Sequence, residues 1–390
     1  MNPQTHHRWR IAGFYFFYFS FVGTYAPYWG LYLKSISLTA IEIGVLMSVQ
    51  PVMRMFAPAL WGWLAEHTGN RLRVIHAAAF ASVLCYAGVF FTTSFWGMFG
   101  VLAAMGFFWT ASMPLVEATT LSYLGKNTAH YGRIRSWGSV GFIVAALALG
   151  ALFDYVSIRW LLWAGLAVML GIMAFSRLLP ATAAEPHHAD RLHLHQIALQ
   201  PAVMAFLSVG FLMAVVHGPY YTFFSIFLVE HHYAKSTVGL LWTLGVVCEI
   251  GIFFTMPWLM HRLSLARILA AALLAAVLRF LLIAWGVDVL ALLLIAQALH
   301  ALTFGAFHAA AVATVHRLFP GRHQSRGQAL YGSLSFGAGG MVGNLLSGPL
   351  WKAWGPAVMY STSAGVAVIG LVILLWQLRE IEARTAGHPG

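Results

Sequence analysis

Residues 62–71 read GWLAEHTGNR and form a short polar stretch where two apolar runs meet. The runs cover residues 40–65 and 74–93, and an α-helix needs roughly 20 apolar residues to cross the hydrocarbon core of a bilayer. The stretch therefore predicts the turn of a helical hairpin whose two arms both span a membrane.

The whole chain follows the same pattern. Of its 390 residues, 60% are hydrophobic and only 8% are charged, whereas soluble domains carry about 25% charged residues. Runs long enough to span a membrane lie at 9–33, 40–65, 74–93, 95–124, 133–153, 158–179, 200–229, 237–260, 266–286, 289–315, 327–351 and 356–378. We therefore predict an all-α integral membrane protein with twelve transmembrane helices.

The formal net charge of +11 could indicate a nucleic-acid partner. The distribution of Lys and Arg along the chain indicates a membrane orientation instead. Fifteen of these residues lie at the chain ends and helix turns on one predicted side of the membrane, and four lie on the other side. Positive residues are retained on the cytoplasmic side of a membrane. We therefore predict a multi-pass protein of the inner membrane with both termini cytoplasmic, in contact with the lipid bilayer and not with nucleic acid.

A polar segment interrupts the apolar pattern at residues 180–199 and contains Glu185 and Asp190. We interpret it as a cytoplasmic linker between a six-helix half at 1–179 and a second half at 200–390. The segment also holds four histidines that could indicate a metal cluster, namely His187, His188, His193 and His195. No Cys or nearby carboxylate pair completes a ligand set, so a solvated loop is favoured, and we expect neither a metal nor a cofactor.

The two halves repeat each other. Gly44 and Gly239 each begin an apolar run and are followed ten residues later by Arg54 and Glu249 respectively. Similar matches join Pro27-Tyr28-Trp29 to Pro219-Tyr220-Tyr221 and Trp137-Gly138-Ser139 to Tyr331-Gly332-Ser333. Three matches in the same order indicate an internal duplication, which is typical of transporters built from two helical halves.

The turn at residues 62–71 resembles the signature of the major facilitator superfamily. In that signature a glycine, an acidic residue, a second glycine and basic residues surround the turn between the second and third helices. This chain has Glu66 where the pattern has aspartate, and His67 and Asn70 where basic residues are usual. The resemblance implies the major facilitator fold, with two pseudo-symmetric halves of six helices.

Five charged side chains lie deep inside the apolar runs: Arg54, Glu117, Arg135, Glu249 and Arg279. A charge at the bilayer centre costs roughly 3 kcal/mol by insertion scales, so such residues normally face a protein interior or an aqueous cavity. Substrate and ion pathways require charges at this depth, and packing seldom does. These five residues are therefore the first candidates for a functional site.

Two pairs of these charges are predicted to lie at equal depths. Glu117 and Arg135 are each nine residues from the centre of the turn between their helices, and Glu249 and Arg279 are each fifteen residues from theirs. At 1.5 Å per residue, the Glu117 and Arg135 pair lies about 14 Å from its turn, and the Glu249 and Arg279 pair lies about 22 Å from its turn. Opposite charges at one depth can neutralise each other, although each pair could also serve only as an assembly contact.

Residues 131–139 read YGRIRSWGS, and together with Glu117, eighteen residues before Arg135, they resemble lactose permease and its relatives. The resemblance implies that Glu117 and Arg135 bind substrate and that the acid matching Glu249 joins them. It also implies proton symport.

Three further segments are similar to the phenylpropionate permease family, a branch of the same proton symporters. They are VVCE at 246–249, VLR at 277–279 and LHALTF at 299–304. Lactose permease carries a protonated glutamate three residues after the histidine of the last of these segments, and this chain has Thr303 there. Glu249 is then the remaining deep acid of the second half and the predicted proton carrier.

The number of deep charges favours an anionic substrate. The apolar runs contain three deep arginines but only two deep glutamates. If each glutamate pairs with the arginine predicted at its depth, Arg54 has no partner. A carboxylate would satisfy the planar guanidinium with two parallel hydrogen bonds. Backbone carbonyls or water in a cavity could equally serve Arg54.

Histidines and tyrosines inside the runs complete the predicted site. His300 and His308 are eight residues apart and thus lie on nearly one face of a helix, with His300 predicted to share a proton with Glu249. His217 also lies inside a run, but a lone histidine there is more often a packing residue. The tyrosines predicted to stack on an aromatic substrate are Tyr18, Tyr25 and Tyr221.

We therefore predict a monomeric, proton-coupled symporter that imports a small organic anion, such as the aromatic monocarboxylate phenylpropionate. The predicted substrate-binding residues are Arg54, Glu117, Arg135, Tyr18, Tyr25 and Tyr221. The predicted proton-coupling residues are Glu249, Arg279, His300 and His308. A sugar or nucleoside symporter and a non-transporting sensor with the same fold are the alternatives. No HExxH or GxSxG motif occurs, so an enzyme is not expected.

Overall fold

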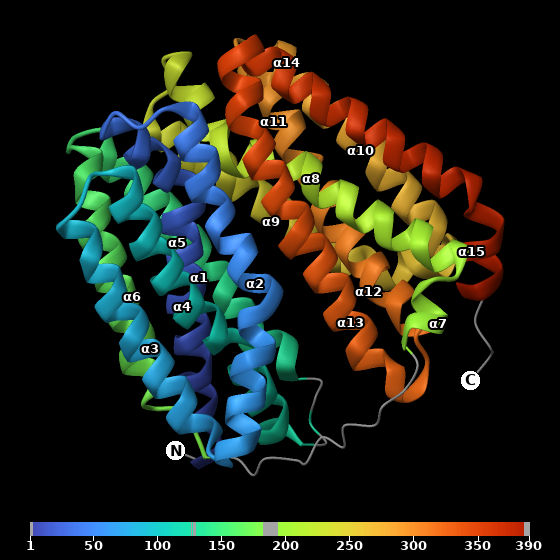
Figure 1. Ribbon diagram of the computed structural model, residues 1–390, viewed down its shortest axis with the longest axis horizontal. Coiled ribbons are helices and arrows are strands. Elements are labelled where there is room, and N and C mark those ends of the chain that lie inside the picture. Colours follow the sequence, from blue (N-terminus) through green and yellow to red (C-terminus); the bar gives the residue numbers. More distant parts are fainter. Residues whose placement is uncertain (1–2, 126, 128–129, 182–193, 386–390) are drawn as a thin grey trace. The chain divides into compact units, whose positions relative to one another are not determined.

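The computed structural model describes residues 3–125, 127, 130–181 and 194–385. Within these ranges every regular element is a helix, and most helices are long (Figure 1). Ten helices of the described part are long and apolar enough to cross a membrane. The predicted class, an all-α membrane protein, is confirmed.

The described residues form two compact units. Unit 1 comprises Met1–His188 with Tyr233–Leu240, and unit 2 comprises Ala189–His232 with Leu241–Gly390. The predicted division at 1–179, 180–199 and 200–390 stays a prediction. Most of the predicted linker lies outside the described residues, including His187, His188 and His193.

The helices that lie wholly in unit 1 are α1 (Pro3–Ser35), α2 (Ala40–Thr68), α3 (Arg71–Ala87), η1 (Gly88–Phe90), α4 (Phe95–Leu124), α5 (Tyr131–Phe153), η3 (Ile158–Trp160) and α6 (Leu161–Ser176). Helix α1 packs against α5 and α6, α4 packs against α2 and α3, and α3 packs against α6. Aromatic side chains of α1 form much of the core, including Phe14, Tyr15, Phe21, Tyr28 and Trp29.

The turn between α2 and α3 follows directly from the stretch at residues 62–71. Gly69 ends α2 with φ of 62°, in the left-handed region that glycine adopts without steric cost. Asn70 then caps α3, because its Oδ1 accepts a hydrogen bond from the backbone N–H of Arg73 at 3.0 Å. At the other end of α2, Thr39 and Glu42 form a capping box.

The helices of unit 2 are α7 (Leu194–Ala198), α8 (Pro201–Glu230), most of α9 (Lys235–Arg262), α10 (Leu265–Gly286), α11 (Leu290–Ala298), η4 (Ala301–Ala306), α12 (Phe307–Leu318), η5 (Gly321–His323), α13 (Gln324–Gly332), η6 (Ser333–Gly339), α14 (Gly340–Trp376) and α15 (Leu378–Thr385). Helix α14 packs against α8 and α10. Helices α8 and α14 approach closely at two glycines, since a Cβ on Gly218 would lie 2.3 Å from the carbonyl carbon of Gly343.

Two segments of unit 2, η4 and η6, are π-helical. A π-helix widens the backbone turn and is frequent at functional sites. Segment η4 contains Thr303 and lies between His300 and His308, the two histidines predicted to share one helix face, which we call the polar stripe.

Two elements account for the difference between the predicted twelve spans and the ten spans found by length and hydropathy. The last of the ten, Gln324–Trp376, contains Gly355 with φ 79° and ψ 175°, so two helices meet there at a break. Helix α1 has 33 residues but is not among the ten. The count of twelve stays a prediction.

Candidate functional site

Unit 1 brings Glu117 and Arg135 into one cluster with side chains of α1. The guanidinium carbon of Arg135 lies 3.9 Å from the ring centroid of Phe19 and 5.6 Å from that of Tyr15. Glu117 accepts a hydrogen bond from the hydroxyl of Tyr131 at 3.3 Å. Both charged side chains are half-buried.

The predicted ion pair between Glu117 and Arg135 does not form. Within the described residues no N···O distance between the two side chains is 4.0 Å or less, because Arg135 turns to the aromatic rings of α1 and Glu117 turns to Tyr131. A cation over an aromatic face gains about 0.5–2 kcal/mol without using its N–H groups. The donors of Arg135 thus stay available for another acceptor.

Arg54 on α2 lies near two of the predicted tyrosines. The charge of Arg54 contributes to the electrostatic environment of the Tyr18 and Tyr25 hydroxyls on α1. The Tyr18 ring stacks on Trp109 at 4.5 Å with an interplanar angle of 6°, and the Tyr25 ring stacks on Trp29 at 5.4 Å and 16°. The structure therefore groups a cation with flat aromatic faces.

The side chain of Arg54 is exposed rather than enclosed by protein, and its predicted role in substrate binding stays a prediction. The residue lies on the α2 segment after Gln50, and that segment turns Ala57, not Arg54, toward the core. Water can serve an exposed guanidinium, so Arg54 does not by itself require an anionic ligand.

In unit 2 the fully buried arginine is Arg279 of α10, which is 0% exposed. Its Nε donates to the carbonyl oxygen of Ala296 at 3.0 Å. Its Nη1 donates to Nε2 of His217 at 3.2 Å and to Oγ1 of Thr303 at 3.3 Å. The guanidinium carbon lies 4.2 Å from the ring centroid of Tyr220. All four of these contacts are with neutral groups.

The contact with Arg279 fixes the protonation of His217. A guanidinium can only donate hydrogen bonds, so Nε2 of His217 must accept. The ring proton of the neutral imidazole then resides on Nδ1, which donates to the carbonyl oxygen of Met213 at 2.8 Å. His217 is thus a neutral acceptor for Arg279. The sequence predicts a packing role for His217, but its position four residues before Tyr221 is the signal that it lies on the site's face.

Three buried nitrogens around Arg279 have no hydrogen-bond partner among the described residues: Nη2 of Arg279, Nε2 of Gln297 and Nδ1 of His300. Gln297 is held by its other end, because its Oε1 accepts from the hydroxyl of Tyr220 at 2.9 Å. Buried polar atoms are usually satisfied, so such a group of open positions is unusual. It surrounds a buried cation whose hydrogen bonds within the described residues are to neutral groups.

His300, Phe304 and His308 form a continuous stack along the helix that includes η4. The His300 and Phe304 rings are 5.4 Å apart at 16°, and the Phe304 and His308 rings are 6.1 Å apart at 15°. The predicted polar stripe therefore has its two histidines on one face, with an aromatic ring between them.

Glu249 lies against the same segment. A Cβ on Gly305 of η4 would be 3.0 Å from Cγ of Glu249, and a Cβ on Gly245 would be 3.2 Å from Cδ2 of His300. Glycine at both positions lets α9 approach the stripe closely. Tyr221 is half-buried and contacts the rings of His217 and Trp242 at 6.2 and 5.9 Å.

No group of three or more His, Cys, Asp or Glu side chains in the described part of the chain could hold a metal ion. His195 lies in α7, and the two cysteines, Cys85 and Cys248, are free and half-buried.

Comparison with known proteins identifies the family. A family model described as "MFS_1 like family" matches residues 8–362. The chain is 29% identical to a probable 3-phenylpropionic acid transporter of Escherichia coli (strain K12), over 90% of this chain and 93% of the relative. It is 27% identical to a maltose permease of Geobacillus stearothermophilus, over 96% and 95% of the two chains.

Among solved structures, the nucleoside transporter NupG superposes with a TM-score of 0.84 at 16% identity, covering 97% of this chain and all 100% of the other. This likeness supports the fold, and the relatives are transporters, not enzymes. The chain belongs to the MFS_1 like family of the major facilitator superfamily and is a multi-pass membrane transporter.

Proposed function

We propose that the protein is a proton-coupled symporter that imports a small organic anion, with an aromatic monocarboxylate such as phenylpropionate as the substrate class. The observation that carries the proposal is Arg279, a fully buried cation with neutral contacts and an unpartnered Nη2. A buried charge without a counter-charge is costly. A substrate carboxylate would supply that counter-charge.

The surroundings of Arg279 favour a carboxylate over a neutral ligand. Nη2 of Arg279 and Nε2 of Gln297 are both N–H donors that have no acceptor among the described residues, and carboxylate oxygens accept only. The Tyr220 ring beside the guanidinium adds an aromatic surface. Arg279, predicted from the sequence as a proton-coupling residue, is therefore proposed as the group that holds the carboxylate.

The other predicted residues keep their proposed roles. Arg54, Glu117, Arg135, Tyr18, Tyr25 and Tyr221 are proposed substrate contacts. Glu249, His300 and His308 are proposed to carry the proton, and Glu249 is the one carboxylate of the three. His217 is not proposed as a carrier, because a proton on Nε2 would face the donor of Arg279. We also propose that the protein is a monomer in the inner membrane, with both termini cytoplasmic.

A sugar or nucleoside symporter is the second candidate. It is favoured by the 27% identity to a maltose permease and by the fold of NupG. A neutral substrate, however, would leave Arg279 without a counter-charge.

Uptake into proteoliposomes tests the proposal. With an inward proton gradient, labelled 3-phenylpropionate should accumulate above its external concentration, and a protonophore should abolish the accumulation. Glu249→Gln should lose uphill uptake but retain exchange of labelled for unlabelled substrate. Asp288→Asn, which alters an exposed acid in the turn after α10, is the matched control and should behave as wild type.

Two results would contradict the proposal. Uphill accumulation by the Glu249→Gln variant would place the proton carrier elsewhere. Accumulation of maltose or a nucleoside without any carboxylate uptake would make the second candidate the function.

A further inference from the structure

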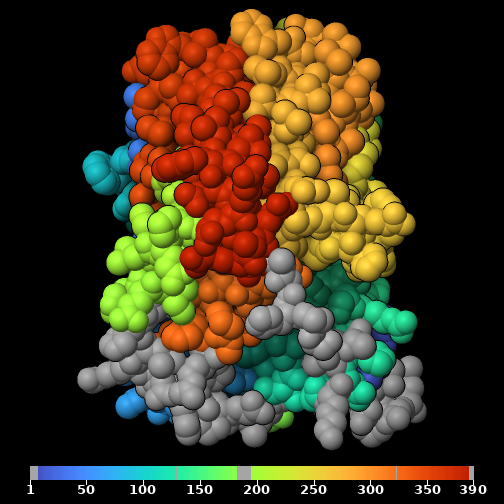
Figure 2. All heavy atoms as spheres, turned by 90° about the vertical axis from the view of Figure 1, so that its right-hand side faces the viewer, coloured from blue at the N-terminus to red at the C-terminus, as the bar shows by residue number. Residues whose placement is uncertain are grey.

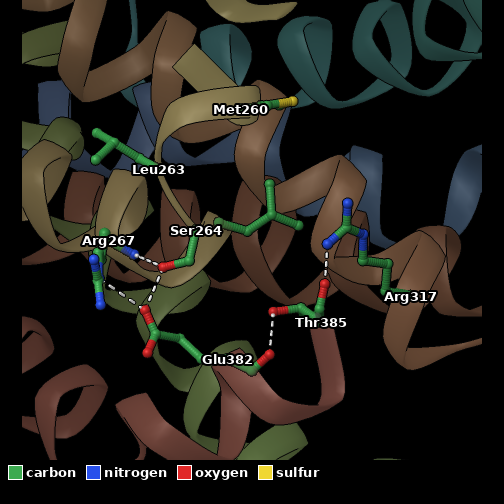
Figure 3. Close-up of a pocket in the computed structure, with 8 residues that line it drawn as sticks. Met260, Leu263, Ser264, Arg267, Arg317, Glu382 and Thr385 are labelled. Atoms are coloured by element: carbon green, nitrogen blue, oxygen red, sulfur yellow. Dashed lines mark hydrogen bonds and ion pairs between the residues drawn. The ribbon is translucent and has the colours of Figure 1, made fainter. Parts of the chain in front are cut away.

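A cavity separate from the proposed substrate site lies in unit 2, where α9 ends and α10 begins (Figure 3). It encloses about 310 Å³, which is at the lower end of the range for small-molecule sites. One wall is the turn of the α9–α10 hairpin. The others are the end of α12, at Arg317, and helix α15, at Glu382 and Thr385. In Figure 2 the red surface of the last helices borders the yellow surface of this hairpin.

The polar side of the cavity is built around Ser264, the N-cap of α10. Its Oγ accepts from the backbone N–H of Arg267 at 3.3 Å and donates to a carboxylate oxygen of Glu382. The same oxygen pairs with Nε of Arg267 at 3.0 Å. Glu382 thus already places one oxyanion at this helix N-terminus, which shows what chemistry the position accepts.

Basic groups exceed acidic ones in the lining. The lining contains two arginines, Arg267 and Arg317, and one acid, Glu382. Each guanidinium has five N–H donors. Arg267 uses its Nε on Glu382, and Arg317 uses Nη1 on the carbonyl oxygen of Thr385. The Arg267 side chain is 63% exposed, so its remaining donors are accessible.

The rest of the cavity lining is apolar, and the turn that it borders joins two candidate membrane spans. Met260, Leu263 and Leu265 line it. Helices α9 and α10 are both candidate membrane spans, so the turn between them lies where a span meets the headgroup region. A ligand matching this cavity has an oxyanion joined to an apolar chain.

We propose that this cavity binds the phosphate headgroup of an anionic phospholipid. Arg317 and Arg267 pair with the phosphate oxygens, Met260, Leu263 and Leu265 contact the start of the acyl chains, and Glu382 competes with the phosphate for Arg267 and Ser264. Basic pockets between helix ends at a membrane surface recognise lipid headgroups in this way.

The test uses the full chain in detergent and measures lipid affinity by native mass spectrometry. The probes are dihexanoyl phosphatidylglycerol, dihexanoyl phosphatidylcholine and inorganic phosphate. Wild type should bind the phosphatidylglycerol most tightly. One charge at a membrane surface changes affinity roughly fivefold, so Arg317→Gln should weaken binding by about that factor. Glu382→Gln should strengthen it by about the same factor, because Arg267 and Ser264 lose their competing carboxylate.

Arg262→Gln is the matched control. Arg262 is exposed near the same turn and lies over the Trp258 ring at 5.9 Å, outside the cavity. Its replacement should change affinity less than twofold. An equal loss in Arg262→Gln and Arg317→Gln would overturn the site, as would weaker binding in Glu382→Gln. Equal binding of inorganic phosphate and phosphatidylglycerol would overturn the lipid assignment.

Discussion

Replacing Arg279 by methionine should leave the stability of the protein nearly unchanged and remove its affinity for carboxylates. The methionine side chain is unbranched and flexible, so it follows the path of the aliphatic part of arginine and fills irregular apolar space well. The substitution deletes a buried charge that has no carboxylate in contact. It therefore separates the proposed role in substrate binding from a role in packing.

The expected stability change follows from the contacts of Arg279. Its three hydrogen bonds, to Ala296, His217 and Thr303, contribute about 2 kcal/mol in total at the average found within membranes. The contact with the Tyr220 ring adds about 1 kcal/mol. Placing an arginine at the centre of a membrane helix costs about 3 kcal/mol. The terms offset each other, so the net change should be within about 1 kcal/mol.

The expected loss of binding is larger. A hydrogen bond to a charged group contributes about 1.5–3 kcal/mol, which corresponds to a roughly 10- to 150-fold change in affinity. Calorimetry should show this loss for 3-phenylpropionate, whereas its uncharged amide should bind wild type and Arg279→Met equally. Arg159→Met, at an exposed position, is the control for the loss of a cation.

Two outcomes would refute this reasoning. Destabilisation by more than about 3 kcal/mol would show that the contacts of Arg279 outweigh its burial cost, and its role would then be structural. Equal losses of affinity for the acid and the amide would show that the charge of Arg279 does not recognise the substrate.

Two further predictions concern contacts inside unit 1. Gly150→Val should lower the thermal midpoint, because a Cβ there would lie 2.7 Å from both the carbonyl oxygen of Lys235 and the hydroxyl of Tyr28, and overpacking costs about 1–3 kcal/mol. A Cβ at Gly132 on the same helix would have no described neighbour within 4 Å, so Gly132→Ala should not lower the thermal midpoint. An equal fall of the midpoint in both variants would refute the packing argument. The pKa of Asp154 is lowered from its ordinary 3.8 by hydrogen bonds from the side chain and backbone of Ser236 and from the backbone of Lys235. This stabilisation is present above pH 3.8 and is lost as the pH falls through the lowered pKa, so melting curves of wild type and Asp154→Asn should differ at pH 6 and converge toward pH 3. A difference that does not change with pH would rule out the carboxylate.

Local features of the sequence are enough to identify the class and the family. The length and polarity of a membrane span are local properties, because every backbone group in a bilayer must be satisfied within its own helix. The turn at residues 62–71 is equally local, since Gly69 and Asn70 end one helix and cap the next without help from distant residues. The stripe of His300 and His308 followed from helical spacing alone.

Tertiary structure decided which charges are buried and what they contact. The sequence counted three deep arginines but could not tell how each helix is rotated about its axis, and that rotation exposes Arg54 and buries Arg279. The sequence predicts Glu117 and Arg135 at equal depth, but it does not show that Arg135 turns to the Phe19 ring on α1. The partner of Arg279 is His217, 62 residues away on α8, and only the packing of α8 and η4 around α10 places His217 and Thr303 beside it. Pairing between helices depends on their rotation and lateral order, which hydropathy leaves open because many arrangements bury the same apolar residues.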